Sequence, residues 1–375
     1  PLPEFTPEQK AEIEAEKAAK AAEIERQRQN RVARNYAITD ADMIGKGGPK
    51  AKVRANLEAL RVLKRMDDES RTIATDEEKR ALVKYVGWGA FAQDVFATHK
   101  DEWARERAEL QNLLTPEEFA SARRSTLNAH YTSPEVIKGM WQALAHLGFK
   151  GGRVIEPSAG IGHFIGLQPE AMRPDTAWTA VELDTVSGRI TKALYGAADV
   201  RIGGFEEQKW PADYFDLAIS NVPFGDYKVD DPAYNKLNLF IHDYFFVKSL
   251  DLVRPGGVVA FITSSGTLDK VRDTARREIE KRGTFLGAVR LPGGSQGAFK
   301  ANAGTDVTTD IIFVRKRMEG EPTNFNAEWQ NLEAIKTPEG STKINAYFAK
   351  RPEMMLGKMR LQGTMYGPNQ PALIG

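Results

Sequence analysis

The sequence predicts an α/β protein: a largely parallel sheet of about seven strands with an antiparallel hairpin at one edge, preceded by a helical extension. Between residues 128 and 317, short apolar runs alternate with amphipathic segments, as in a sheet with helices on both faces. The last two runs leave no room for a crossover helix, which predicts an antiparallel pair. The expected strands are residues 153–156, 177–182, 199–202, 215–220, 257–263, 286–291 and 310–315.

The helical extension is predicted for residues 1–127. Thr6, Pro7 and Gln9 form a helix start with an N-cap, a proline at the first helical position and a glutamine at the third. Residues 7–34 carry almost no apolar stripe, which favours a solvated helix. The acid-free end of this helix, residues 26–31, offers an alternative role as a contact to phosphates.

The rest of the extension, residues 50–127, has recurring apolar residues that predict further helices, one of them beginning at Thr115-Pro116. Gly87-Trp88-Gly89 is interpreted as a turn whose aromatic side chain packs in the core. Residues 318–375 show little periodicity and are expected to be a tail or the start of a further domain. The first residue, Pro1, and the loop-like end lead us to expect a fragment of a longer chain.

Composition excludes several classes of function. The 375 residues carry a net charge of +1, so the overall charge does not by itself indicate a nucleic-acid partner. The absence of cysteine excludes disulfides, thiolate metal sites and cysteine nucleophiles, and the five histidines show no metal-ligand spacing. No apolar run could cross a membrane and no signal-peptide pattern is present. We therefore expect a cytoplasmic protein without a metal or a membrane partner.

The first expected strand ends at Glu156-Pro157 and leads into a loop with glycines at 160 and 162. Glycines there let the backbone approach a ligand at a helix start. A dinucleotide fingerprint would need a third glycine where Ile165 stands. Glu156 would repel a pyrophosphate but suits a cation such as the ammonium of an amino acid. A structural turn explains the glycines equally well.

The second expected strand ends in Glu182-Leu183-Asp184, and Glu182 follows Gly162 at the spacing of an acid that binds ribose hydroxyls. Helix capping is the alternative role for an acid here. Together the two loops favour a ligand with an adenosine, an amino-acid end and no phosphates, a description that S-adenosylmethionine fits. Phe205, after the third strand, would either contact the edge of the adenine ring or belong to the core.

Asn221-Val222-Pro223-Phe224 follows the fourth expected strand, at the edge of the sheet where open α/β folds place their ligands. This tetrapeptide offers a side-chain amide, a backbone carbonyl, a rigid proline and an aromatic face. Such a set can hold a planar amino group while stacking on the ring that carries it. A strand-to-loop turn without a catalytic role is the alternative.

These ordered motifs resemble those of adenine-N6 DNA methyltransferases, of the γ group and the type I modification subunits. EPSAGIGHF resembles their S-adenosylmethionine loop, AVELD their ribose-binding acid, GGF the segment at the cofactor's adenine, and NVPF the catalytic Asn/Asp-Pro-Pro-aromatic motif. AHYTSP resembles the segment around the methionine end, and residues 292–309 resemble the loop that contacts the target base. The resemblance covers residues 128–317, half of the chain.

The resemblance implies S-adenosylmethionine-dependent methylation of adenine in DNA by base flipping. The catalytic residues would be Asn221, Val222, Pro223 and Phe224. The cofactor would contact Tyr131, Thr132, Glu156, Pro157, Gly160, Gly162, Glu182, Leu183, Phe205 and Asn221.

Two positions depart from the family pattern. Val222 replaces the first proline, but the family uses the backbone carbonyl there, so activity is expected to survive. Gly204 stands where an acid commonly binds the cofactor's adenine amino group, and Glu206 is the nearby candidate to replace it.

A narrower resemblance, through YVGWGAF and AGTDVTTDIIF among other segments, is to the methylase part of large phage, plasmid and integrative-element proteins. Some of these join a helicase or act against restriction, so DNA and a helicase domain are the expected partners. The alternatives are a protein methyltransferase that modifies glutamine and a cofactor- and DNA-binding module without activity. Ile165 and Glu156 argue against a nicotinamide-dependent oxidoreductase.

Overall fold

The computed structural model describes residues 5–125, 132–293, 307–364 and 367–375, and it contains the predicted seven-stranded sheet. The strand order is β3-β2-β1-β4-β5-β7-β6. The first five strands in this order are parallel, whereas β7 pairs antiparallel with both β5 and β6. The strands are β1 (Gly152–Glu156), β2 (Thr176–Glu182), β3 (Asp199–Ile202), β4 (Phe215–Asn221), β5 (Val253–Ser264), β6 (Gly283–Leu291) and β7 (Thr309–Lys316).

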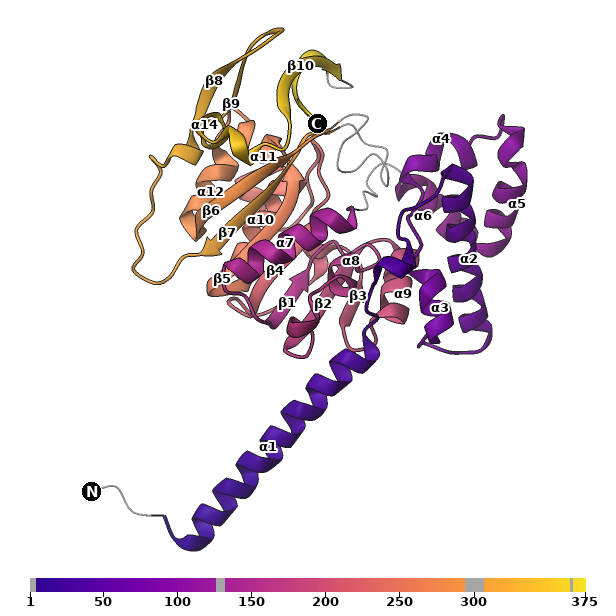
Figure 1. The fold of residues 1–375 in the computed structure, drawn as a ribbon, viewed down its shortest axis with the longest axis vertical. Coiled ribbons are helices and arrows are strands. Elements are labelled where there is room, and N and C mark those ends of the chain that lie inside the picture. The colour runs from indigo at the N-terminus through magenta and orange to yellow at the C-terminus, as the bar shows by residue number, and fades with distance from the viewer. Residues whose placement is uncertain (1–4, 126–131, 294–306, 365–366) are drawn as a thin grey trace.

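Helices cover both faces of the sheet because the strands are apolar on both sides. Residues of β4 enter two cores: Leu217 and Ile219 pack with one set of helices, and Phe215 and Ala218 with the other. The first set is α7 (Pro134–His146), α8 (His163–Gly166) and α9 (Thr185–Leu194), and the second is α10 (Ile241–Leu252) and α12 (Thr274–Arg282) (Figure 1).

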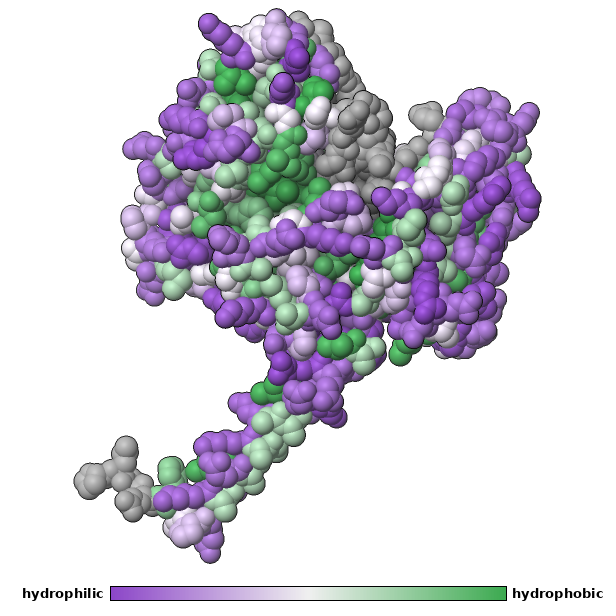
Figure 2. Space-filling model, in the orientation of Figure 1, coloured by the Kyte–Doolittle hydropathy of each residue, from purple (hydrophilic) through white to green (hydrophobic). Residues whose placement is uncertain are grey.

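The first helix, α1 (Pro7–Arg34), begins as predicted: the Thr6 hydroxyl accepts from the Gln9 amide, and the Gln9 side chain accepts from the Thr6 amide. At 1.5 Å per residue the helix is about 42 Å long. It projects from the body (Figure 1), and its surface is largely hydrophilic, with a weakly hydrophobic stripe (Figure 2). None of its residues is buried, which confirms the expected solvated helix.

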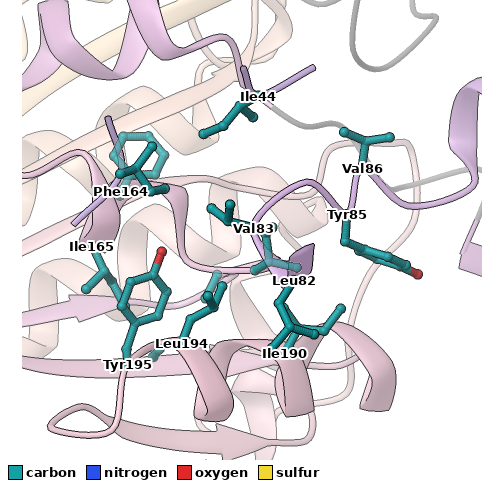
Figure 3. Close-up of a cluster of buried hydrophobic side chains, with 14 of the residues drawn as sticks. Ile44, Leu82, Val83, Tyr85, Val86, Phe164, Ile165, Ile190, Leu194 and Tyr195 are labelled. Atoms are coloured by element: carbon teal, nitrogen blue, oxygen red, sulfur yellow. The ribbon is translucent and has the colours of Figure 1, made fainter. Parts of the chain in front are cut away.

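The rest of the extension shares a core with the sheet domain. Leu82, Val83 and Val86 pack in the same cluster as Phe164 and Ile190 (Figure 3). Trp88 is 1% exposed, as its predicted core role requires. The helices are α2 (Pro49–Asp68), α3 (Asp76–Leu82), α4 (Ala92–Val95), α5 (Ala104–Leu113) and α6 (Pro116–Ser125).

The C-terminal part has more regular structure than its sequence predicts. Residues 332–374 form two antiparallel hairpins and a short helix, attached where β6 ends: the Leu356 amide donates to the Arg290 carbonyl, and Leu373 donates to Thr308 Oγ1. The elements are β8 (Leu332–Thr337), β9 (Gly340–Asn345), α14 (Ala346–Lys350), β10 (Lys358–Thr364) and β11 (Gly367–Ile374). Among the described residues, no helix combines the length and the apolarity that a bilayer crossing needs.

Candidate active site

A cavity of about 560 Å³ lies at the carboxyl ends of β1 to β4. After β3 the chain crosses to the other side of β1, so β1 and β4 flank the point where the strand order reverses. Open α/β sheets bind their ligands at this point. Most of the predicted site residues line the cavity: Thr132, Glu156, Pro157, Gly160, Glu182, Leu183, Phe205, Asn221, Val222 and Pro223.

Two of the predicted residues that the structure describes are not on the cavity wall. Phe224 follows the wall residue Pro223 but does not line the cavity. Gly162 has φ 75°, and a Cβ on it would lie 2.5 Å from Cε2 of Tyr195, so this glycine permits close packing of the loop. Tyr131 lies outside the described residues, as does most of the predicted base-contacting loop 292–309.

Glu156 ends β1 as a buried acid with an unused acceptor. Its side chain is 1% exposed, and its Oε2 atom has no hydrogen-bond partner among the described residues. Burial, and then the nearby charge of Glu182, raise the pKa of Glu156 well above its ordinary value. A buried carboxylate needs a cation or donors to remain charged, so this position fits an ammonium group from a ligand.

Glu182 is the last residue of β2, and its side chain hydrogen-bonds to the loop that follows β1. Its carboxylate accepts from the Gly160 amide at 2.7 Å and from the Asp184 amide at 2.8 Å. Thr191 Oγ1 donates to the Gly160 carbonyl at 2.8 Å, so the glycine loop is held from both sides. A carboxylate has about four acceptor sites, so Glu182 can also accept a hydrogen bond from a ligand hydroxyl.

The stability of the ligand-free protein should depend on pH through Glu182. Burial, followed by the charge of Asp184, raises the pKa of Glu182 from 4.5 to about 7. Between these values the folded state binds more protons at this site than the unfolded state, so the free energy of unfolding falls as pH rises. Denaturant unfolding at pH 5, 6 and 7 should show a flatter slope for Glu182→Gln than for the wild type. Parallel slopes would contradict the assignment.

The end of β4 is fixed against its neighbours. Ser220 Oγ donates to the Ser158 carbonyl at 3.1 Å, which joins β4 to the loop after β1. Asn221 pairs with Ile262 of β5, and the Val222 amide donates to the Ile262 carbonyl at 3.1 Å. The Val222 side chain is 1% exposed. The Val222 side chain therefore packs in the core beneath the cavity wall, to which Asn221, Val222 and Pro223 all contribute.

The helical extension supplies part of the wall, which the sequence did not indicate. Tyr85 and Gly87 line the cavity together with His163 of the loop after β1. Burial lowers the pKa of His163 to about 4, against the opposing effect of a hydrogen bond with the Val83 backbone. His163 is therefore neutral at pH 7 and joins the loop after β1 to the extension. The sequence predicts Gly87-Trp88-Gly89 to be a turn with its aromatic side chain in the core, and no spacing links this turn to the loop that carries Gly160 and Gly162.

Tyr227 is a further wall residue that sequence reasoning missed. It follows the Asn221 tetrapeptide on the same loop, and its backbone carbonyl accepts from the Ile241 amide at 2.9 Å. Ile241, the first residue of α10, also lines the cavity. The sequence feature that could have indicated Tyr227 is its place as the second aromatic residue of NVPFGDY, three positions beyond Phe224.

The acceptor and apolar groups on the cavity wall fit S-adenosylmethionine. The unpartnered buried carboxylate of Glu156 suits its ammonium group, Glu182 suits a ribose diol, and Phe205 provides an apolar wall for a ring. Phe205 is 2% exposed and packs on Phe245 with ring centroids 4.9 Å apart. Within the described ranges, no group of three or more His, Cys, Asp or Glu side chains could hold a metal ion.

No protein-family model matches the chain. The chain is 28% identical over 279 residues to "Defense against restriction protein B" of Escherichia phage P1, a match that covers 72% of this chain and 10% of that protein. It is 29% identical over 178 residues to "Type II methyltransferase M.XamI" of Xanthomonas campestris pv. amaranthicola, covering 42% of this chain and 33% of that protein.

Among solved structures, the type I restriction-modification methyltransferase subunit from Streptococcus thermophilus is 17% identical and has a TM-score of 0.43. The match covers 80% of this chain and 78% of that chain. The chain spans a third or less of the length of the curated relatives it matches. The chain is therefore similar in sequence to a phage protein of defence against restriction and to a type II methyltransferase. Its sheet has the predicted arrangement, largely parallel with an antiparallel edge.

Proposed function

We propose that this chain transfers a methyl group from S-adenosylmethionine to the exocyclic amino group of adenine in DNA. The observation that carries the proposal is the common cavity of Glu182, Glu156 and Asn221, at the ends of the adjacent strands β2, β1 and β4. Similarity to a defence-against-restriction protein and to a type II methyltransferase supports DNA as the substrate.

In this proposal Glu156 binds the ammonium of the cofactor and Glu182 accepts from the ribose hydroxyls. The Gly160 backbone, held by Glu182 and Thr191, passes close to the ligand without a side chain in the way. Tyr85 and Gly87 close the wall on the side of the extension and exclude water. When bound, the cofactor supplies a methyl group activated by a sulfonium.

The target base would be held by the tetrapeptide after β4. The adenine amino group donates one hydrogen bond to Asn221 Oδ1 and one to the Val222 carbonyl. These bonds localise the lone pair that is otherwise delocalised into the ring. Val222 serves as well as proline because only its carbonyl is used. Phe224 would stack on the extruded base, which offsets part of the few kcal/mol that base flipping costs, with about 1 kcal/mol from ring stacking.

The direct test is to incubate the protein and cofactor with plasmid DNA from a host that lacks adenine methylation. The DNA is then digested to nucleosides and analysed by mass. N6-methyladenine in the complete reaction, and none without cofactor, is the expected result. A parallel reaction with isotope-labelled cofactor and glutamine-containing peptides tests protein methylation. Label in the peptides but not in the DNA would overturn the proposal.

A further inference from the structure

The first helix carries a long face that the body leaves uncovered. Figure 1 shows α1 projecting away from the sheet domain, and none of its residues is buried. Near its C-terminal end, Arg28 Nε forms an ion pair with Asp175 Oδ1 at 3.0 Å, and Arg31 donates to the Pro174 carbonyl at 2.9 Å. Within the described part of the chain, side chains of residues 7–27 form hydrogen bonds and ion pairs only inside this helix and its cap. This length of helix is therefore available to a partner.

Charge is divided along α1. Residues 7–16 hold four glutamates and one lysine, a net charge of −3, whereas residues 26–34 hold four arginines and no acid, a net charge of +4. This division suits the helix dipole of a single copy. It also makes the helix complementary to a second copy that runs in the opposite direction, because each acidic end then lies beside an arginine-rich end. A parallel pair would place like charges together.

Between the charged ends lies a line of exposed alanines with alternating spacings of four and three residues, the spacing of the contact face in a coiled coil. They are Ala11, Ala15, Ala18 and Ala22. Ala19 and Ala21 flank the line at its middle, whereas Lys20 falls on the opposite side of the helix at 3.6 residues per turn. Such small side chains let two helices pack with their axes near the short end of the usual range of about 8–10 Å.

We propose that two copies of this chain pair through antiparallel α1 helices centred near residue 20. Ala18 of one copy then packs on Ala22 of the second copy, and two-fold symmetry repeats this contact. The two bodies lie at opposite ends of the pair, because each is attached at the C-terminal end of its own helix. Arg31, which contacts the body, falls on the side of the helix opposite the alanines. The inference goes beyond the proposed function and does not depend on it.

The same register brings acids of one copy to arginines of the other. The positions that flank the alanine line hold Glu12 and Arg26 on one side and Glu14 and Arg28 on the other. In the antiparallel pair Glu12 lies near Arg26 of the second copy, and Glu14 lies near its Arg28. Arg28 can serve Asp175 and a second carboxylate together, because a guanidinium has five donors. Exposed ion pairs are weak and screened by salt, so we expect a weak dimer that dissociates in high salt.

Sedimentation velocity on the full chain at rising protein concentrations tests the pairing. The wild type should show a monomer–dimer equilibrium at low salt, and it should shift to monomer at about 1 M salt, where the Debye length is about 3 Å. A wild type that stays monomeric at low salt up to near-millimolar concentration would overturn the inference.

Two charge reversals give a sharper test. Glu12→Arg and Arg26→Glu each replace an attraction by a repulsion in both symmetric contacts, so each should raise the dissociation constant of the dimer about tenfold. An equimolar mixture of the two variants should restore the dimer, because the reversed charges then meet opposite charges in both contacts. Lys20→Glu, a matched reversal on the other side of the helix, should pair as the wild type does. Wild-type pairing by Glu12→Arg and by Arg26→Glu would contradict the proposed contacts.

Cross-linking can establish the direction of the helices, because the chain contains no cysteine. A mixture of Ala18→Cys and Ala22→Cys under a mild oxidant should form disulfides between the two variants faster than either forms them alone. A disulfide needs Cβ atoms about 3.5–4.5 Å apart, which the antiparallel register favours for positions 18 and 22. A parallel pair would link each variant to itself. The linked tryptic peptides distinguish these products, and faster linkage within one variant would overturn the antiparallel arrangement.

Discussion

Asn221→Ala is expected to abolish methyl transfer while the protein still binds S-adenosylhomocysteine. Asn221 lies at the end of β4, adjacent to the β1 end that carries Glu156, and it lines the same cavity. Removing its amide removes one of the two acceptors that activate the target nitrogen. Loss of one positioned hydrogen bond to a reacting group costs about 10²- to 10³-fold in turnover in well-studied enzymes. Initial rates with labelled cofactor and plasmid DNA measure the effect.

The matched variant is Asn221→Asp, which keeps an acceptor oxygen in the same place and should retain part of the activity. Calorimetry with S-adenosylhomocysteine serves as the control for an intact cofactor site. Full turnover by Asn221→Ala would contradict the role assigned to the amide. If Asn221→Ala also lost cofactor binding, the role of Asn221 would be to bind the cofactor and not the target base.

Arg290→Ala is expected to cause the largest loss of stability of any single change considered. Arg290 and Asp310 are both fully buried, with Nε–Oδ1 at 2.7 Å and Nη2–Oδ2 at 2.9 Å. Nη1 of Arg290 also forms an ion pair with Asp269 Oδ2 at 2.8 Å, and the guanidinium lies 4.3 Å from the Phe348 ring centre. Removing the cation from a buried pair costs about 3–5 kcal/mol.

The carboxyl that loses its partner explains the direction of this effect. Burial raises the pKa of Asp310 to about 6, even though Arg290 opposes the shift. Without Arg290 nothing offsets the cost of burying the charged Asp310 carboxylate. The free energy of unfolding from denaturant titrations at pH 8 should therefore fall by about 3–5 kcal/mol. Replacing both partners, as Arg290→Met with Asp310→Leu, should recover most of the loss. A loss below about 1 kcal/mol in Arg290→Ala would show that the pair is not buried in solution.

The sheet was predictable because its strands are buried on both faces and appear as continuous apolar runs. The segment from Phe215 to Ile219 shows this, and so does the pair β6 and β7, whose short connection required an antiparallel arrangement. The hairpins β8–β9 and β10–β11 escaped prediction for the opposite reason. β8 is largely exposed, so its sequence lacks both an apolar run and a strict alternation.

The candidate site was predictable where one strand end carries one functional group, as at Glu156, Glu182 and Asn221. It was not predictable where the wall depends on contacts between distant parts of the chain. Tyr85 lies about seventy residues before the loop after β1, and no local pattern marks their proximity. Glu206 is predicted from the sequence as a candidate to replace an acid at position 204, and it does line the cavity. That its carboxylate lies in the space a side chain at Gly204 would take could not be predicted, because it depends on the folded loop.

The wall contributed by Tyr85 and Gly87 has a thermodynamic consequence. A ligand in the cavity touches the extension and the sheet at once, so its binding free energy holds these two parts of the chain together. At a hundred times its dissociation constant, such a ligand adds about 2.7 kcal/mol to the stability of the unit it bridges. Truncation before the sheet would therefore remove a stabilising linkage as well as a set of helices, and it would leave the cavity open to solvent on that side.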